Sequence, residues 1–127
     1  MYKKKQFKKS EAHYRKYQYV GITGKAMDYC HRDLEKCFLL NKKYSQVLEI
    51  GAGTSPHINY IKHNYDKYYS LETSKFAILY LKKKFKKKKI HPIYYNGIKM
   101  PFKNKFFDRI IISHVLEHIN DPEKFII

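Results

Sequence analysis

Cysteine is scarce in this sequence, and the long apolar runs that membrane segments need are missing. The two cysteines, Cys30 and Cys37, lie about two helical turns apart in a segment with helical periodicity, too far for a disulfide. A metal site would need more ligands at closer spacing. No run approaches the roughly 20 apolar residues of a bilayer span, and the basic N-terminus lacks the apolar stretch of a signal peptide. These absences predict a cytoplasmic protein with reduced thiols, no metal site and no transmembrane segment.

Acidic residues are also few, with 11 Asp and Glu against 27 Lys and Arg and a formal net charge of +16. A basic surface attracts phosphate backbones, so weak non-specific binding of nucleic acid is one interpretation. Only three of the basic residues are arginine, the side chain that dedicated phosphate and guanine sites favour. Lys, Tyr, Ile, Asn and Phe are enriched together, which is typical of A/T-rich codon usage, and we favour this compositional explanation.

The length of 127 residues suits one small domain, and the hydrophobic content of 43% is ordinary for a globular core. Residues 1–25 are rich in Lys and Tyr, and we expect a basic arm or lid there, with a turn-rich connector at 20–24. Residues 26–127 are expected to form the domain itself. Its first element is a helix over 26–40, where apolar residues recur at helical spacing.

The rest of the chain alternates between strand and helix patterns. Strands are expected at 46–50, 68–72, 90–95 and 108–112. Helices are expected from Ser55 through Tyr65, over 75–89, and from Asp121 onward. This alternation predicts an α/β fold, a Rossmann-like parallel sheet of about four strands with helices on both faces.

Glycine is rare, but two of the five glycines stand in Val47–Gly53, between the first strand and the next helix. Such a turn lets a ligand approach the backbone and the helix N-terminus. The third glycine of a dinucleotide fingerprint is missing, since Pro56 stands in its place. Glu49 lies two residues before Gly51, and its carboxylate suits a ligand with an ammonium and a sulfonium but would harm a pyrophosphate site. The alternative is a surface glutamate at a strand end.

Glu72 lies 21 residues past Gly51, at the end of the second predicted strand. An acidic residue there can accept hydrogen bonds from both ribose hydroxyls of an adenosine cofactor. NAD enzymes share this feature, so it supports adenosine without choosing the cofactor. A helix-flanking acid in Leu71–Ser74 is the alternative interpretation.

The segment Met100–His118 contains a Met-Pro-Phe turn, a Phe-Asp strand start and a His-Val-Leu-Glu-His stretch. Together with Val47–Gly53 and Glu72, it resembles class I S-adenosylmethionine-dependent methyltransferases, especially the small-molecule subgroup similar to ubiquinone/menaquinone-pathway enzymes. The resemblance covers roughly residues 45–127. It implies an incomplete class I methyltransferase fold, truncated at its C-terminus, because the family has further strands and helices after the fourth strand.

The resemblance also implies S-adenosyl-L-methionine as the cofactor, held by residues at the ends of all four strands. These residues are Glu49, Gly51, Ala52, Gly53, Glu72, Thr73, Asn96, Gly97, Ile98, Ser113 and His114. Glu72 would hold the ribose, with Thr73 beside the adenine, and Asn96 would lie at the adenine edge. Asn96 stands where the family often has Asp, but its side-chain carbonyl still offers an acceptor.

The implied reaction is methyl transfer to a small-molecule, lipid or glycan acceptor. A general base is optional for such a transfer. His114 is the nearest candidate, and His118 is a weaker one that alternatively stabilises the turn before Asp121. We expect little turnover from these 127 residues alone, and a second chain is one way to complete the sheet beyond its fourth strand.

Two other functions remain as alternatives. The first is a non-catalytic basic module that binds nucleic acid or partners another methyltransferase subunit. The second, an NAD-dependent oxidoreductase, is disfavoured by Glu49 and by the missing third glycine. Ser113–Leu116 stands where methyltransferases of base amino groups carry an Asn/Asp-Pro-Pro-aromatic motif, which argues against that substrate class.

Overall fold

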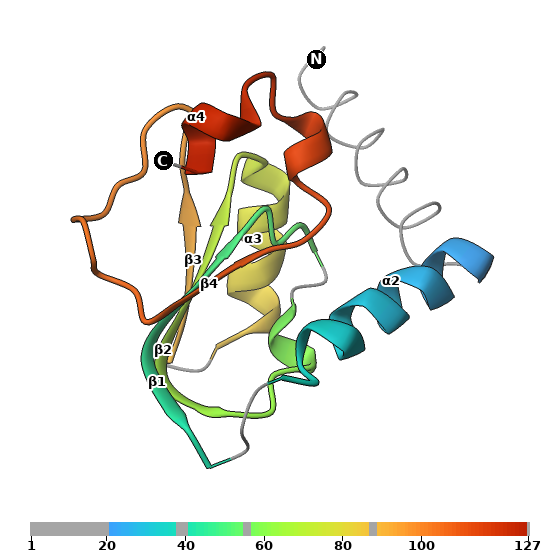
Figure 1. The fold of residues 1–127 in the computed structure, drawn as a ribbon. Coiled ribbons are helices and arrows are strands. Elements are labelled where there is room, and N and C mark those ends of the chain that lie inside the picture. The colour runs from blue at the N-terminus through green and yellow to red at the C-terminus, as the bar shows by residue number, and fades with distance from the viewer. Residues whose placement is uncertain (1–20, 38–40, 55–56, 87–88, 127) are drawn as a thin grey trace.

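The computed structural model describes residues 21–37, 41–54, 57–86 and 89–126. At its centre lies a four-stranded sheet with the order β3-β2-β1-β4 (Figure 1). The strands are β1 (Lys43–Ile50), β2 (Asn64–Glu72), β3 (Ile90–Tyr94) and β4 (Arg109–Ile112). All three pairings are parallel, so the four strands end at the same edge of the sheet. The predicted Rossmann-like α/β fold is confirmed.

The order in which strands are added to the sheet reverses at β1. β2 and β3 lie on one side of β1, whereas β4 lies on the other. Ile50, the last residue of β1, is paired with Leu71 of β2 and with Ile112 of β4. In open parallel sheets, ligands bind outside the carboxyl ends of the strands at such a switch point. The topology therefore places a candidate site beyond Ile50.

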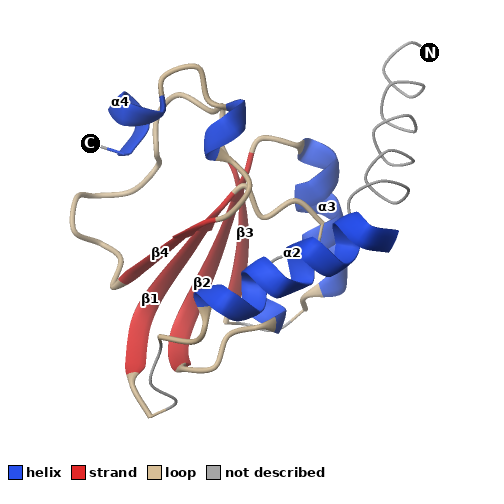
Figure 2. Cartoon of the chain, turned by 45° about the vertical axis from the view of Figure 1, so that its right-hand side comes forward, coloured by secondary structure: helices blue, strands red, loops and turns tan. Residues whose placement is uncertain are grey.

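Helices and loops cover the two faces of the sheet. The helices are α2 (Gly21–Leu34), α3 (Lys75–Lys84) and α4 (Pro122–Ile126), with short 3₁₀ helices η1 (His57–Asn59) and η2 (Leu116–His118). α2 and α3 lie on one side of the sheet, and α4 lies on the other with the long loop between β3 and β4 (Figure 2). Met100, Phe102 and Phe107 of that loop pack against the second face.

Two apolar clusters fill the space between these layers. Period-2 alternation along the strands sends successive side chains to opposite faces. On the face toward η1, the cluster consists of Val47, Tyr68 and Ile111, with Tyr44, Ile58, Ile61 and Tyr65 packed against them. On the face toward the β3–β4 loop, Leu48, Ile50, Leu71 and Tyr95 are buried against residues that include Met100, Phe102, Phe107 and Phe125.

α3 was predicted well from its local signals. It begins directly after Ser74, whose side chain accepts a hydrogen bond from the Ala77 amide as an N-cap. Ile78 and Leu81 are buried, as their spacing predicts. The helix ends at Lys84 rather than at 89, because Phe85 leaves the helical conformation; residues 87–88 lie outside the described residues.

The two helices before α3 differ from the prediction. α2 already begins at Gly21, so the expected connector is helical over 21–24, and the helix ends at Leu34 rather than at 40. The predicted helix from Ser55 through Tyr65 is wrong: 55–56 lie outside the described residues, only η1 follows, and β2 begins at Asn64. The pairing of β2 with β1 overrides the local helical pattern there. Of the arm expected at 1–25, residues 1–20 lie outside the described residues and 21–25 belong to α2.

Two bulk features agree with the sequence. Cys30 is half-buried and Cys37 is exposed, and neither forms a disulfide. No helix in the described ranges has the length and apolar character needed to cross a bilayer. β4 forms an edge of the described sheet, and its Ile110 is 54% exposed.

Candidate functional site

Two adjoining cavities lie at the carboxyl ends of the strands, with volumes of about 480 Å³ and 310 Å³. Both are lined by Gly51 after β1, by Glu72 and Thr73 at the end of β2, and by Val115 and His118 after β4. The larger cavity extends toward β3 and α4, and the smaller one toward α2. The two cavities share these residues as a common wall at the switch point beyond Ile50, and we refer to them together as the cleft.

Glu49 faces the smaller cavity from the end of β1 and is 4% exposed. Its Oε1 accepts a hydrogen bond from the His57 amide at 2.7 Å, and its Oε2 accepts one from the Tyr68 hydroxyl at 2.7 Å. Burial raises the pKa of Glu49 to about 7, and the nearby Glu72 carboxylate adds to the rise. Glu49 is therefore a buried carboxyl close to its titration point at neutral pH, and the alternative of a surface glutamate is wrong.

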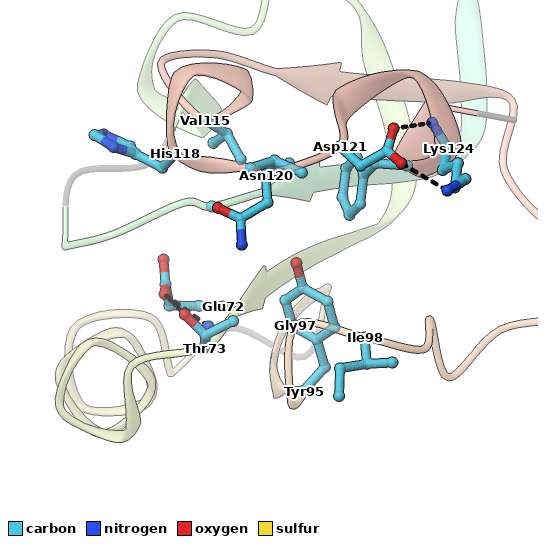
Figure 3. Close-up of a pocket in the computed structure, with 13 residues that line it drawn as sticks. Glu72, Thr73, Tyr95, Gly97, Ile98, Val115, His118, Asn120, Asp121 and Lys124 are labelled. Carbon is cyan, nitrogen blue, oxygen red and sulfur yellow. Dashed lines mark hydrogen bonds and ion pairs between the residues drawn. The ribbon is translucent and has the colours of Figure 1, made fainter.

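Glu72 is held from several sides by backbone amides. Its Oε1 accepts hydrogen bonds from Thr73 N at 2.7 Å and Ser74 N at 2.9 Å, and its Oε2 accepts one from Gly53 N at 3.0 Å. These bonds connect the glycine turn after β1 to the start of α3. Glu72 lines the larger cavity (Figure 3). It also lines the smaller cavity together with Glu49, so the two predicted carboxylates share that cavity.

The turn after β1 requires glycine. Gly51 has φ of 70° and Gly53 has φ of 55°, in the left-handed region that other residues adopt at a cost. A Cβ atom on Gly51 would lie 2.3 Å from Cγ2 of Val115. The close approach of Val115 brings the segment after β4 over the glycine turn. Nothing in the sequence pattern predicted this contact.

Of the predicted cofactor-binding residues after β3 and β4, all but Asn96 line one of the two cavities. Gly97 and Ile98 line the larger cavity, and Ser113 and His114 line the smaller one, as does Ala52 of the glycine turn. Asn96 lines neither cavity. Its Oδ1 accepts hydrogen bonds from Ile98 N at 3.0 Å and Lys99 N at 3.3 Å, so its side chain shapes the turn after β3.

Several residues that line the cleft were not predicted. They are Met27 and His31 of α2, Tyr95 after β3, Val115, Ile119, Asn120, Asp121, Lys124 and Phe125. In Figure 3, the Tyr95 hydroxyl and the Asn120 side chain approach the space opposite Glu72 from two walls. Tyr95 directly follows a strand end, which is a usable signal. The positions of α2 and α4 depend on tertiary packing, which leaves no signal in a local pattern.

A buried polar network lies behind the smaller cavity. The Nδ1 atoms of His31 and His57 are 2.8 Å apart, and Nε2 of His57 lies 2.6 Å from Oε1 of Glu35. The same carboxylate oxygen accepts a hydrogen bond from the Arg109 guanidinium at 2.5 Å. The pKa of Glu35 is lowered below its usual value because hydrogen bonds from Arg109 and His57 outweigh its burial. The network ties α2, η1 and β4 together.

Comparison with known proteins finds a matching family and a shared fold. The family model described as a methyltransferase domain matches residues 48–127. A solved protein from Methanococcus maripaludis, described as an S-adenosyl-L-methionine-dependent methyltransferase, shares 13% identity with a TM-score of 0.66, over 89% of this chain and 51% of that one. No curated protein matches the chain.

Two further solved structures share the fold. One is a protein from Haloferax volcanii, described as a methyltransferase and complexed with the activator Trm112, with 10% identity and a TM-score of 0.62 over 76% of this chain and 42% of that one. The other is the plantazolicin methyltransferase BpumL in complex with SAH, with 15% identity and a TM-score of 0.53 over 97% of this chain and 44% of that one. The chain spans about half the length of these structures or less. Since the family model covers the strand ends and the glycine turn that build the cleft, the chain belongs to the methyltransferase domain family, whose methyl donor is S-adenosyl-L-methionine.

Proposed function

We propose that the cleft binds S-adenosyl-L-methionine, and that the protein transfers its methyl group to a small-molecule, lipid or glycan acceptor. The observation that carries the proposal is the pair of carboxylates, Glu49 and Glu72, that share one cleft with the glycine turn 51–53. When bound, the cofactor supplies an electrophilic methyl group on a sulfonium. A cleft with two carboxylates suits the positive charges of this ligand, whereas a pyrophosphate would be repelled.

The residues of the cleft fit the parts of this ligand in a definite order. Each oxygen of a carboxylate can accept more than one hydrogen bond, so Glu72 can accept from the ribose hydroxyls while it keeps its backbone partners. The methionyl part would lie beside Gly51–Gly53, close to Glu49. The adenine would lie in the larger cavity against Thr73, Gly97 and Ile98.

The protein's contribution to the reaction is chiefly geometric. A sulfonium is a good leaving group, so holding the acceptor in line and excluding water supplies much of the rate. His114 lines the cavity and is the candidate base when the acceptor is a hydroxyl. We propose that the protein belongs to the small-molecule subgroup similar to ubiquinone/menaquinone-pathway enzymes.

Calorimetric titration with S-adenosylhomocysteine and with NAD⁺ tests the proposal. We expect saturable binding of the first, insensitive to salt, and none of the second. Glu72→Ala should weaken binding at least tenfold because the ribose loses its acceptor. The matched control is Glu117→Ala, an exposed carboxylate of η2 that does not line the cleft. Equal affinities of the two variants would contradict the proposal.

A partner chain is a further part of the proposal. Ile110 of β4 is exposed, and a third cavity of about 310 Å³ lies beside it, lined by apolar residues that include Leu48, Phe102 and Phe107. An exposed edge strand with apolar side chains favours pairing with another polypeptide. A second chain that completes the sheet at β4 would also supply part of an acceptor pocket.

A further inference from the structure

His31 is a buried polar residue to which the proposed methyl transfer gives no role. It lies on α2, is 4% exposed, and lines the smaller cavity together with Glu49 and the glycine turn. Its ring stacks on Tyr60, with centroids 4.8 Å apart. Its Nδ1 meets His57, but its Nε2 is buried and has no hydrogen-bond partner within the described part of the chain. Leaving a buried polar nitrogen without a hydrogen bond costs free energy of folding, so this atom is a candidate contact for a ligand.

The hydrogen-bond chain behind His31 fixes which of its nitrogens carries the proton. The Glu35 carboxylate, ionised beside Arg109, can only accept, so Nε2 of His57 donates to it. Burial lowers the pKa of His57, which keeps it neutral, and its Nδ1 is then an acceptor. Nδ1 of His31 must therefore donate to His57. Burial also lowers the pKa of His31 to about 4, so the ring is neutral and its Nε2 carries a free lone pair.

We propose that Nε2 of His31 accepts a hydrogen bond from the ammonium group of the methionyl part of S-adenosyl-L-methionine. This inference rests on the proposed function, because it assumes that the methionyl part lies beside the glycine turn. A cavity with Glu49, a neutral imidazole acceptor and, among the described residues, no lysine or arginine on its wall attracts an N–H donor of positive charge. His57 and Glu35 act as positioning residues, since they set the tautomer of His31.

The chemistry of the network favours His31 as an acceptor of hydrogen bonds rather than as a general base. A group that stays neutral throughout the physiological range does not repel a sulfonium or an ammonium. Its low basicity makes it a poor acceptor for a full proton from a hydroxyl. The carboxylate behind His57 sets the tautomers of both rings, so that His31 presents a lone pair at Nε2.

The test compares S-adenosylhomocysteine with its analogue in which hydrogen replaces the amino group. In His31→Asn, the side-chain amide can still donate to His57 but no acceptor remains at the Nε2 position. We expect this variant to bind S-adenosylhomocysteine about tenfold more weakly and the analogue as well as the wild type does. The control is Tyr29→Phe, an exposed residue of the same helix, which should change neither affinity.

The possible results separate this inference from the proposed function. Equal weakening of both ligands, or no weakening, overturns the role of His31 while the cofactor site stands. Failure of the wild type to bind either ligand overturns both proposals. A measurement on the wild type guards against poor folding of the variant: the ¹⁵N chemical shift of His31 Nε2 should move on binding S-adenosylhomocysteine and not on binding the analogue. Identical shifts with both ligands contradict the inference.

Discussion

The carboxyl group of Glu49 couples the chemistry of the ligand to the protonation of a single residue. It accepts hydrogen bonds from His57 and Tyr68, which favour its ionised form, but burial dominates and raises its pKa to about 7. A cation bound nearby would favour ionisation. The charge on this residue at neutral pH therefore depends on what occupies the cleft.

The ratio of affinities for S-adenosyl-L-methionine and S-adenosylhomocysteine should rise with pH. Only the first ligand carries the sulfonium charge, and Glu49 is increasingly ionised as pH rises from 6 to 8 through its pKa of about 7. Titration calorimetry across this range measures the ratio. Glu49→Gln should leave the ratio flat, since the amide does not titrate. A ratio independent of pH in the wild type would contradict the assignment.

The raised pKa of Glu49 also predicts how the stability of the fold changes with pH. Between about pH 4.5 and pH 7, Glu49 is protonated in the folded chain and ionised in the unfolded one, so unfolding releases a proton and stability falls as pH rises. The contribution is on the order of 3 kcal/mol over this window. Urea unfolding at pH 5 and pH 7.5 should show a smaller difference for Glu49→Gln than for the wild type. An equal difference in both proteins would assign the effect to other groups.

Gly51→Ala separates backbone strain from steric clash at the glycine turn. Gly51 and Gly21 both have φ of 70°, so alanine costs roughly 1–2 kcal/mol in backbone conformation at either position. Only at Gly51 would the new Cβ atom meet Val115, which adds about 1–3 kcal/mol. Thermal or urea unfolding of Gly51→Ala and Gly21→Ala measures the difference in stability. Adding Val115→Ala to Gly51→Ala should restore part of the lost stability. Equal losses would show that the contact with Val115 is unimportant.

At the scale of elements, α2 is held to the sheet by a buried polar network. Glu35 follows the helix, is fully buried, and contacts both His57 of η1 and Arg109 of β4. The amide of Lys62 also donates to it, at 3.1 Å. Met27 and His31 of α2 line the smaller cavity. The contacts of Glu35 therefore link the stability of the fold to the site.

Glu35→Gln should destabilise the chain by about 3–5 kcal/mol, because it removes the carboxylate from a buried ion pair with Arg109. The matched control is Asp33→Asn, which removes an exposed ion pair with Lys36 and should cost about 0–1 kcal/mol. Denaturant unfolding gives both values. Similar losses in the two variants would contradict a special role for the buried network.

The order of the elements could be predicted from the sequence because it depends on local signals. The strand ends at Ile50 and Glu72 and the glycine turn each lie within a few residues of the pattern that identifies them. The pairing of β2 with β1, from Asn64 onward, joins residues that lie far apart in the chain. Such contacts override weak local preferences.

The site was predictable to the same extent. The carboxylates at 49 and 72 lie where strand ends must meet, so their shared cleft follows from the topology. The Asn96 side chain was expected at the adenine edge, but short-range hydrogen bonds to the following amides hold it in a turn. His31 gave no signal, since its place on the cavity wall follows from how α2 packs.

At the scale of the whole molecule, the exposed edge at β4 is the place where we propose that another chain pairs. Ile110→Lys places a charge on an exposed edge strand without disturbing a buried residue. We expect the variant to show less self-association than the wild type by sedimentation velocity. The control is Ile22→Lys, an exposed isoleucine on α2 far from this edge in the sequence. Equal association of both variants would contradict an adhesive β4 edge.

The account depends most directly on the position of the ligand in the cleft. A crystal structure of the protein with S-adenosylhomocysteine measures it. We predict that the Glu72 carboxylate lies within hydrogen-bond distance, about 2.5–3.0 Å, of the ribose hydroxyls, with the methionyl part against Gly51–Gly53 and beside Glu49. A ligand bound elsewhere, or bound with its ribose away from Glu72, would contradict the assignment of the cleft.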